Sequence, residues 1–421
     1  MIQKTNPILQ WVLTIAGIIA VLAGLTWGNY RYCKENPGGN DFLVHWMGTK
    51  TFLTEGISPY SDETAIRIQT FAYGRPAQPG EHELRVAYPL YSIVVFLPFA
   101  LISDYVFARA LWMTVLEVAL LLLSVVSIRL ADWKPRILNF AIFFLFSIVW
   151  YHAVRPVING NAVVLVALAL AGGLLALKHE ADELAGVLLA FSTIKPQVVI
   201  VPAIFLLYWT VSRRRWRYVF WFLGTLFLLS ASVALLLPDW IIQNILEVLR
   251  YPGYNPPGTF GTALGALIPA MGKRIGYGVT GVLTLLLLIE WRVSRQTGKD
   301  GFVWTACFTI AASFWIGIQT DPGNFIVGLP ALVMVFALWE GRWRQAGSVL
   351  TLVSMLLLGV GLWVIFVNTV EYGAQPQQGP QMFFPFPAFL LITLYWVRWW
   401  AVQSPNVWFE KYTQSNVPYQ R

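Results

Sequence analysis

The chain has 421 residues, of which 57% are hydrophobic and only 12% are charged, and its mean hydropathy is +0.61. Soluble domains cannot bury that much apolar side chain, so the composition excludes them and predicts an all-α polytopic membrane protein. The net charge of +8 comes mainly from short arginine-rich segments between apolar runs, which indicate membrane orientation and not nucleic-acid binding. The two cysteines, Cys33 and Cys307, lie far apart in the sequence and favour neither a disulfide framework nor a metal site.

Residues 8–27 form the first predicted span. Little positive charge precedes this span and no small-residue cleavage site follows it, so we interpret it as an uncleaved anchor with a cytoplasmic amino terminus. A polar insert, residues 29–87, comes next, and its nearly balanced charge is compatible with translocation. Hydrophobic periodicity within the insert predicts two short helices, over residues 41–55 and 61–73.

The topology of residues 88–209 has two interpretations. Residues 88–102 are apolar but short and contain Pro89 and Pro98, which predicts a re-entrant or tilted juxtamembrane segment, followed by spans over 105–128, 137–153 and 162–177. The apolar run 184–209 is interrupted at Pro196 and ends at SRRRWR, which predicts a broken re-entrant pair that returns to the cytoplasm. The alternative makes 88–102 a full span and 184–209 one kinked helix. We prefer the first topology because it keeps the basic segment RLADWKPR cytoplasmic.

The second half alternates more regularly between apolar spans and polar connections. Spans are predicted over 218–237, 275–291, 301–318, 325–339, 347–367 and 383–402, for a total of about eleven. The connections QTDPGN and NTVEYGAQPQQGPQ contain no Lys or Arg, so we expect them on the outer face. The outer loop 238–274 includes an amphipathic stretch, DWIIQNILEVL. We find no internal repeat in the sequence, which weakens an inverted-repeat transporter.

One carboxylate stands out by its position. Asp41 lies at the outer end of the first predicted span, and His45 follows one helical turn later on the same face. This placement suits a general base with an imidazole as its orienting partner. The other interpretation is an ordinary helix N-cap, in which Asn40 or Asp41 accepts backbone hydrogen bonds. The residues alone favour the cap and leave the base open.

A lysine within an apolar run is the second candidate. Lys195, with Gln197 two residues later, lies at the predicted helix break. An ionisable side chain at membrane depth is costly, so it usually faces a cavity and has a partner, for which a lipid phosphate is suitable. Alternatively, Lys195 reaches the membrane interface with an extended side chain.

Other polar candidates occur in the predicted outer connections. The segment RPVINGN offers donors for a sugar or phosphate from Arg155, Asn159 and Asn161, although its proline and glycine also suit a plain turn. The histidines show no metal-ligand spacing, and no glycine-rich nucleotide motif occurs in a strand–helix context. Arg85 and Tyr88, at the end of the polar insert, are candidates for meeting a phosphate. Asp321 and Asn324 in QTDPGN are candidates for lining an outer cavity, although the pattern slightly favours a simple Asx turn.

Several segments, in this order, carry a family resemblance over residues 26–217. They are NDF, EGISPYSD, AYPLYSIVVFLPFALIS, NGNAVVLVALAL, LAGVLLAFSTIKPQVVIVPAIFLLYW and RRRWR. This pattern resembles glycosyltransferase family 87, the polyprenyl-phosphate-mannose-dependent α-mannosyltransferases of the GT-C fold. Two positions depart from the family pattern. The family frequently has Gly-Gln-x-Asn, whereas in this chain Asn161 directly follows Gly160. Leu90 occupies a position where the family usually has a second proline.

The resemblance implies an inverting transfer of a hexose, with mannose expected, from a polyprenyl-phosphate donor to a lipid-linked or cell-envelope glycan. Asp41 matches the family's catalytic aspartate and would deprotonate the acceptor hydroxyl, while Lys195, Arg85 and Arg155 are candidates for stabilising the leaving phosphate. No metal or cofactor is implied. The implied site lies on the non-cytoplasmic face of the plasma membrane.

The implied organisation is a GT-C-like catalytic membrane module over residues 1–217, including the outer loop 29–87, completed by transmembrane helices over 218–421. A transporter or a lipid or glycan flippase is the main alternative, because broken helices and a lysine at membrane depth also fit that class. The long polar insert with its own helices argues against it. A ligase or polymerase of GT-C type is a minor alternative, since it would need a longer outer loop in the second half.

Overall fold

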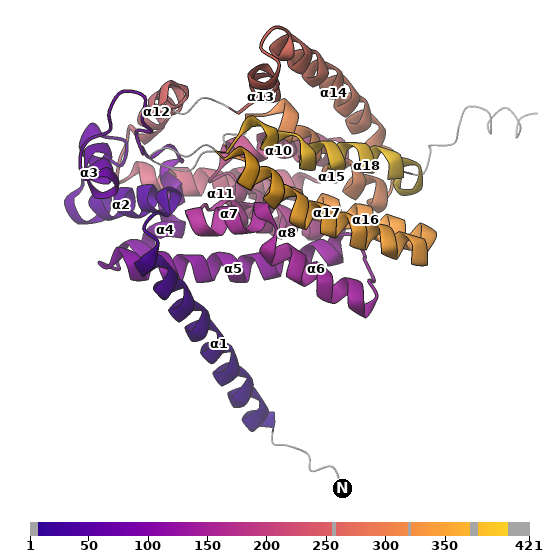
Figure 1. Cartoon of the computed structure of the whole chain (residues 1–421), viewed down its shortest axis with the longest axis horizontal. Coiled ribbons are helices and arrows are strands. Elements are labelled where there is room, and N and C mark those ends of the chain that lie inside the picture. Colours follow the sequence, from indigo (N-terminus) through magenta and orange to yellow (C-terminus); the bar gives the residue numbers. More distant parts are fainter. Residues whose placement is uncertain (1–6, 255–257, 319–320, 371–377, 403–421) are drawn as a thin grey trace, which may run out of the picture. The chain divides into compact units, whose positions relative to one another are not determined.

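The structure, a computed structural model, describes residues 7–254, 258–318, 321–370 and 378–402. Every regular element in these ranges is a helix, and Figure 1 labels most of them. The helices of the first half are α1 (Pro7–Glu35), α2 (Asn40–Glu55), α3 (Asp62–Tyr73), η1 (Leu90–Ser92), α4 (Ile93–Ala100), α5 (Tyr105–Leu130), α6 (Ile137–Val149), α7 (Tyr151–Asn159), α8 (Val163–Lys178), α9 (Asp182–Ser192) and α10 (Pro196–Ser212). The remaining helices are α11 (Trp216–Ala234), α12 (Trp240–Tyr254), α13 (Phe260–Leu267), α14 (Gly272–Ser294), α15 (Lys299–Ile316), η2 (Pro322–Gly328), α16 (Leu329–Trp343), α17 (Gln345–Thr369), η3 (Pro380–Phe383) and α18 (Pro385–Ala401).

Eight helices in the described ranges are long and apolar enough to cross a membrane. This confirms the prediction of an all-α polytopic membrane protein. Three shorter apolar helices, Leu90–Ala100, Val163–Lys178 and Pro196–Ser212, add to the eight. Helix α15, over the expected span 301–318, is in neither group. The expected total of about eleven crossings therefore stays a prediction.

The two short helices of the polar insert are confirmed. Helix α2 covers the predicted 41–55 helix, and α3 begins after Ser61, whose side chain accepts a hydrogen bond from the Thr64 backbone N–H (3.2 Å). The interruption at Pro196 is also confirmed, because α9 ends at Ser192 and α10 begins at Pro196. Proline suits the first helical position, where its missing N–H has no intrahelical partner to lose. The run 184–209 is therefore two helices and not one kinked helix.

The chain forms two compact units, each assembled from separated parts of the sequence. Unit 1 comprises Met1–Leu120, Val154–Leu165 and Leu229–Pro256; unit 2 comprises Leu121–Ala153, Val166–Leu228 and Pro257–Arg421. These are units of packing, and the expected functional division near residue 217 stays a prediction.

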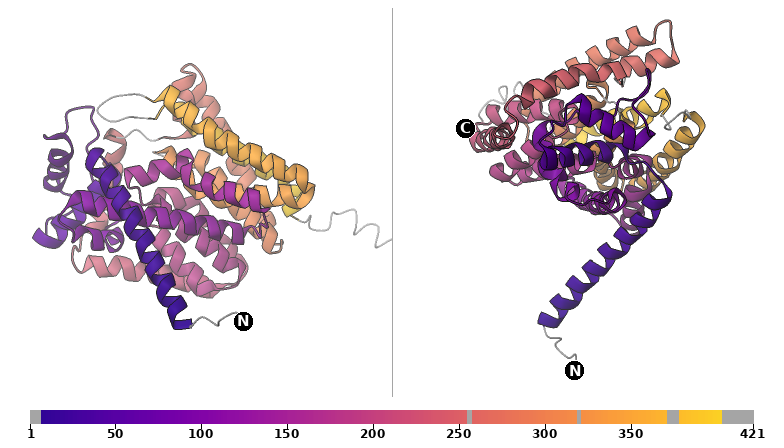
Figure 2. Two further views of the ribbon diagram at one scale, coloured as in Figure 1. Left: turned by 60° about the horizontal axis from the view of Figure 1, so that its bottom comes forward. Right: turned by 90° about the vertical axis from the view of Figure 1, so that its left-hand side faces the viewer.

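Unit 1 is built around aromatic packing between α2, α4 and α5. The ring of Phe42 stacks on that of Trp112 at 5.5 Å, and Phe96 and Phe99 pack against the same indole. Phe42 and Trp112 are fully buried. Helix α1 joins this unit near its carboxyl end, where Asn29 donates to Glu117 of α5 (2.9 Å). The apolar side chains of the preceding turns of α1 are exposed, and Figure 2 shows α1 as one long straight helix from two directions.

Unit 2 contains most of the remaining apolar helices. Arg398 of α18 pairs with Glu290 of α14 (2.7 Å), and Trp304 of α15 donates to the Leu394 carbonyl of α18 (2.9 Å). Helices α15 and α16 are buried along most of their length. These contacts join α14 and α15 to α18, and α15 and α16 form the buried centre of this unit.

Candidate active site

Asp41 lies in the first turn of α2 in unit 1. The helix begins after Gly38 and Gly39, which have φ of 141° and 77° and so adopt conformations that favour glycine. Gly39 is the N-cap residue, so Asn40 and Asp41 are both inside the helix. The N-cap interpretation of these two residues is therefore wrong by position. As a half-buried carboxylate in the first turn, Asp41 still benefits from the positive end of the helix dipole.

Two asparagine side chains hold the Asp41 carboxylate. The amide Nδ2 atoms of Asn159 and Asn161 both donate to Asp41 Oδ2, at 2.6 and 2.9 Å. The Oδ1 atom of Asn161 accepts from the backbone N–H of Val163 (2.9 Å), which fixes the orientation of its amide. A carboxylate can accept about four hydrogen bonds, and these two amide donors fix the orientation of Asp41.

The asparagines are placed by the end of α7. The Asn161 N–H donates to the Pro156 carbonyl (2.7 Å) and the Gly160 N–H to the Val157 carbonyl (3.1 Å). Together with the left-handed Gly160 (φ 71°), these bonds form a Schellman motif. The expectation of a plain loop over RPVINGN is thus wrong at its start, because the helix continues to Asn159 with Pro156 inside it. The predicted turn is confirmed at Gly160.

Gly160 also permits a close approach between α2 and this turn. A Cβ atom at Gly160 would lie 2.4 Å from Phe42 Cβ. Because Phe42 is the neighbour of Asp41, this contact brings Asn159 and Asn161 beside the carboxylate.

Arg109 of α5 connects the two glycine-containing segments. This almost fully buried guanidinium donates to the Asn36 carbonyl (2.8 Å) and to the Ile158 carbonyl (3.0 Å). A Cβ atom at Gly39 would lie 2.3 Å from its Nε atom. The sequence reasoning missed Arg109, although a charged residue inside an apolar span is itself a signal of function or of special structure.

Two aromatic residues on the same face of α5 complete the support. The Tyr105 hydroxyl donates to the Gly38 carbonyl (2.8 Å), and Trp112 Nε1 donates to the Gly160 carbonyl (2.8 Å). Tyr105, Arg109 and Trp112 have the i, i+4, i+7 spacing of one helical face. One face of α5 thus fixes both backbone segments that position Asp41 and its asparagine partners.

His45, the expected orienting partner, lies among aromatic rings. Its buried imidazole is 3.9 Å from the Tyr88 ring and 4.7 Å from the Phe96 ring, measured between centroids. A small, partly enclosed cavity of about 10 Å³ beside His45 and Tyr88 is about the smallest that can hold one water. The role of His45 in orienting Asp41 stays a prediction.

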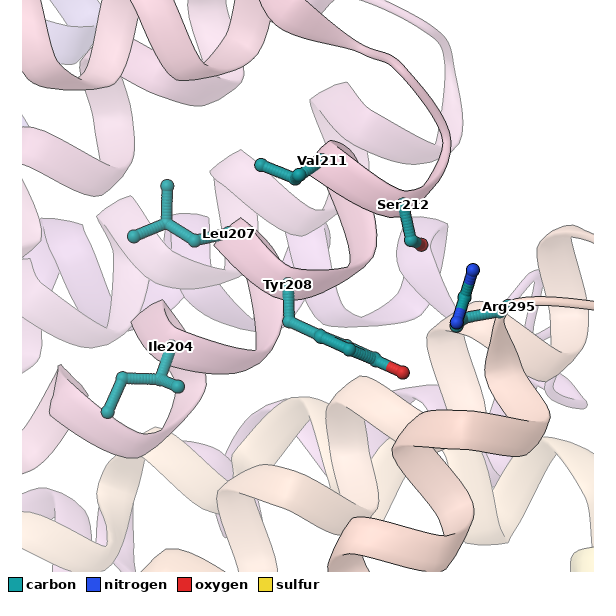
Figure 3. Close-up of a pocket in the computed structure, with 6 residues that line it drawn as sticks. All are labelled: Ile204, Leu207, Tyr208, Val211, Ser212 and Arg295. Atoms are coloured by element: carbon teal, nitrogen blue, oxygen red, sulfur yellow. The ribbon is translucent and has the colours of Figure 1, made fainter.

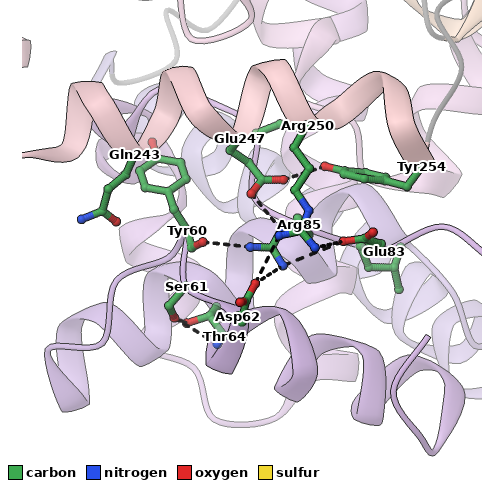
Figure 4. A network of polar contacts seen from close by, with 12 residues as sticks. Tyr60, Ser61, Asp62, Thr64, Glu83, Arg85, Gln243, Glu247, Arg250 and Tyr254 are labelled. Carbon is green, nitrogen blue, oxygen red and sulfur yellow. Dashed lines mark hydrogen bonds and ion pairs between the residues drawn. The ribbon is translucent and has the colours of Figure 1, made fainter. Parts of the chain in front are cut away.

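Arg85, a candidate for phosphate binding, is held by carboxylates of the protein itself. Figure 4 shows its guanidinium donating to Glu247 (2.8 Å), to Asp62 (2.7 Å) and to the Tyr60 carbonyl (3.1 Å). The hydrogen bond from Arg85 lowers the pKa of the Asp62 carboxyl below its ordinary value. This arrangement is typical of a structural ion pair between α12 and the insert. A phosphate at Arg85, which stays a prediction, would have to compete with these carboxylates.

Unit 2 places two further candidates in contact. Lys195 Nζ donates to Asn324 Oδ1 (2.7 Å), and both side chains are buried. The alternative that Lys195 extends to the membrane interface is therefore wrong. Asp321 caps η2 by accepting from the Gly323 N–H (2.6 Å), which is the Asx turn expected for this segment. Gln197 is half-buried in the first turn of α10.

Arg155 is half-buried on α7 in unit 1, one turn before Asn159. The structure thus brings Asp41, Asn159 and Asn161 together in unit 1, and Lys195 and Asn324 together in unit 2. A shared cavity for the two groups stays a prediction.

An open groove of about 500 Å³ lies on one face of α10 (Figure 3), and none of the candidates above lines it. Apolar side chains dominate its lining, with a hydroxyl and a guanidinium at one end; it is lined by Ile204, Leu207, Tyr208, Val211, Ser212 and Arg295. In the described part of the chain, no group of three or more His, Cys, Asp or Glu side chains could hold a metal ion.

The fold and this site define a polytopic membrane protein with an oriented carboxylate. Comparison with protein families gives a match to glycosyltransferase family 87 over residues 87–313, which is more than half of the 421 residues. The chain belongs to glycosyltransferase family 87. It is therefore a membrane glycosyltransferase, and family membership favours glycosyl transfer over transport.

The matched segment differs from the segment that carried the sequence resemblance. It extends past residue 217, where the sequence resemblance ends, and it includes Asn159, Asn161 and Lys195. It begins at Ala87, so it does not include Asp41. Searches of curated proteins and of solved structures gave no match.

Proposed function

We propose that this protein transfers a hexose, with mannose first among the candidates, from a polyprenyl-phosphate donor to a lipid-linked or cell-envelope glycan. Asp41 acts as the general base. The observation that carries the proposal is the pair of hydrogen bonds from Asn159 and Asn161 to Asp41 Oδ2. A base must be held in a productive orientation, and here the oriented carboxylate remains partly exposed to solvent.

The reaction follows from these roles. Asp41 removes the proton from an acceptor hydroxyl as its oxygen attacks the anomeric carbon of the sugar. The bond from that carbon to the phosphate oxygen breaks, and the polyprenyl phosphate leaves with the electron pair. Attack from the face opposite to the phosphate inverts the anomeric configuration. The proton on Asp41 then passes to solvent.

The leaving phosphate gains negative charge and needs cationic stabilisation. Lys195 and Arg155 are the first candidates, since Arg85 is bound by Glu247 and Asp62. The Lys195 ammonium is buried and already donates to an oxygen of Asn324, and a phosphate oxygen is a suitable acceptor for a lysine of this kind. His45 and Tyr88 are candidates for contacting the sugar, as are Gln197, Asp321 and Asn324.

A donor comparison with the purified full chain tests this proposal. Polyprenyl-phosphate mannose, glucose and arabinofuranose are supplied in turn with a crude envelope glycolipid acceptor, and the anomeric configuration of the product is read by NMR. We expect transfer from the mannosyl donor with inversion. Transfer only from a nucleotide sugar, or with retention, would contradict the proposal.

The proposal places the site on the non-cytoplasmic face of the plasma membrane. Ile158, next to Asn159, has a partly exposed side chain suitable for labelling. We expect Ile158→Cys to react with an impermeant maleimide added from outside the cytoplasm. Reaction only from the cytoplasmic side would contradict this orientation.

A further inference from the structure

The amphipathic stretch expected in the outer loop forms α12, and its two faces are reversed relative to a helix of a soluble protein. The side chains that point into unit 1 are mainly polar. Asn244 donates to the Ala87 and Tyr88 carbonyls (3.1 and 3.2 Å), and Glu247 accepts from Arg85 (2.8 Å). Figure 4 shows Glu247 and Arg250 directed from α12 toward Arg85.

The opposite face of α12 is wholly aliphatic and exposed. Its side chains are between 49% and 73% exposed, and they are Ile241, Ile242, Ile245, Leu246, Val248 and Leu249. At 100° per residue these positions form one stripe, whereas Trp240, Asn244, Glu247 and Tyr251 lie on the other side. A stripe of this kind in water is a binding surface or an aggregation hazard.

Two observations favour hydrocarbon as the medium that covers the stripe. Helix α12 follows α11, a candidate membrane span, after only residues 235–239, and Leu235 and Leu236 of this connection are highly exposed. The stripe carries no charged side chain.

Length excludes a full crossing by α12. Its 15 residues extend about 22 Å, whereas the hydrocarbon core of a bilayer is about 30 Å thick. The buried ion pair between Glu247 and Arg85 also ties one face of the helix to protein along its middle. A helix with one aliphatic face and one protein-bound polar face suits an orientation parallel to the membrane surface.

We propose that α12 lies in the bilayer interface, with its aliphatic stripe inserted among lipid acyl chains. Its polar face fixes the backbone of Ala87 and Tyr88, so α12 holds this segment at the membrane surface. The Tyr88 ring in turn packs against the His45 ring, with the centroids 3.9 Å apart. This inference concerns the membrane contact of the enzyme and is independent of the identity of the sugar donor.

Fluorescence quenching in the full chain tests the proposal. Ile242→Cys and Leu249→Cys are labelled with bimane and reconstituted into phosphatidylcholine–phosphatidylglycerol vesicles with or without bromine on the shallow part of the acyl chains. We expect loss of fluorescence in the brominated vesicles and protection from aqueous iodide, because interfacial helices bury about 5–10 Å into the headgroup–acyl boundary.

Matched positions in unit 1 serve as controls. Glu63→Cys on α3 is exposed and polar in its surroundings, so it should be quenched by iodide alone. Ile19→Cys on α1 should be quenched by bromine placed deeper in the acyl chains, since α1 is a candidate span. The chain without added cysteine gives the background, because Cys33 and Cys307 are buried.

The other occupants of the stripe have distinct signatures. Quenching by iodide and not by brominated lipid would place α12 in water and overturn the proposal. Protection from both quenchers would assign the stripe to a protein partner or a second copy of the chain. If quenching by brominated lipid is lost only when polyprenyl phosphate is added, the stripe binds the tail of that lipid.

Discussion

Gly160→Ala is the substitution that most directly perturbs the support of Asp41. Gly160 has a φ of 71°, and an added Cβ would lie 2.4 Å from Phe42 Cβ and 3.3 Å from the Phe42 backbone nitrogen. The substitution adds one methyl group and removes no hydrogen-bonding group. Its effect therefore reports on backbone conformation and on the distance between the α7 turn and α2.

Gly160→Ala has two free-energy costs, one for the backbone conformation and one for steric overlap. A left-handed conformation costs an L-residue about 1–2 kcal/mol, and the steric overlap adds about 1–3 kcal/mol by analogy with overpacked cores. Relief of the overlap requires the turn to move by about 1 Å, since carbon atoms prefer separations near 3.5 Å. That movement lengthens the 2.6 and 2.9 Å bonds to Asp41 beyond good hydrogen-bond geometry. A misplacement of this size can reduce turnover by about 100-fold.

Gly74→Ala is the matched control. Gly74, at the end of α3 in the same unit, has a φ of 73°, but an added Cβ there would have no neighbour within 4 Å. We expect Gly74→Ala to lower thermal stability slightly and to leave sugar transfer intact. Gly160→Ala should lower both stability and transfer further. Equal transfer rates for the two variants would refute the argument that close packing at Gly160 positions the asparagines.

Three further predictions concern charged and titratable groups. Arg85→Met leaves the buried Glu247 carboxylate without its main partner, so the free energy of unfolding should fall by about 3–5 kcal/mol. Adding Glu247→Met removes the unpaired charge and should restore much of this loss. A double variant no more stable than Arg85→Met alone would contradict the prediction. Burial lowers the pKa of His82 to about 4, whereas the pKa in the unfolded chain is near 6.5. Between these two pH values the folded state binds fewer protons than the unfolded state. The protein therefore loses at most about 3 kcal/mol of stability as the pH falls from 6.5 to 4. His82→Gln should abolish that part of the pH dependence in thermal melts, and an unchanged profile would exclude His82 as its source. Lys195→Met should reduce kcat by about 10²–10³-fold if this lysine stabilises the leaving phosphate, whereas near-normal turnover in a folded variant would remove it from the reaction.

The sequence was sufficient for features that local pattern encodes. Composition indicated the membrane class, and hydrophobic periodicity located α2 and α3. The proline at position 196 located the break between α9 and α10. Each of these depends on neighbours within one or two helical turns.

Contacts between distant segments could not be read in the same way. Asp41 and Asn159 are separated by 118 positions, and Arg85 and Glu247 by 162. No local signal in the sequence indicates that Arg85 pairs with a carboxylate on α12. From the sequence alone, Arg85 was therefore a candidate for phosphate binding. Arg109 was overlooked since its backbone acceptors come from two turns that only the fold brings together.

For helix α12, the sequence pattern could not show which face of the helix contacts protein. A 3.6-residue pattern predicts that one face is apolar and the other polar, but it does not say which of them contacts protein. In a soluble protein the apolar face would be assigned to the core. In this chain the polar face makes the protein contacts, as the bonds of Asn244 and Glu247 establish.

The central claim, that Asp41 is the catalytic base, is tested most directly by Asp41→Asn in the reconstituted transfer assay. The asparagine is nearly isosteric but cannot accept the acceptor proton, and loss of a general base costs about 10²–10⁴-fold in rate. Glu63→Gln, which neutralises an exposed carboxylate in the same unit, is the control and should retain full activity. We predict that Asp41→Asn inserts and melts like the unsubstituted protein but loses transfer by at least two orders of magnitude. Transfer at the unsubstituted rate would contradict the assignment of Asp41 as the base.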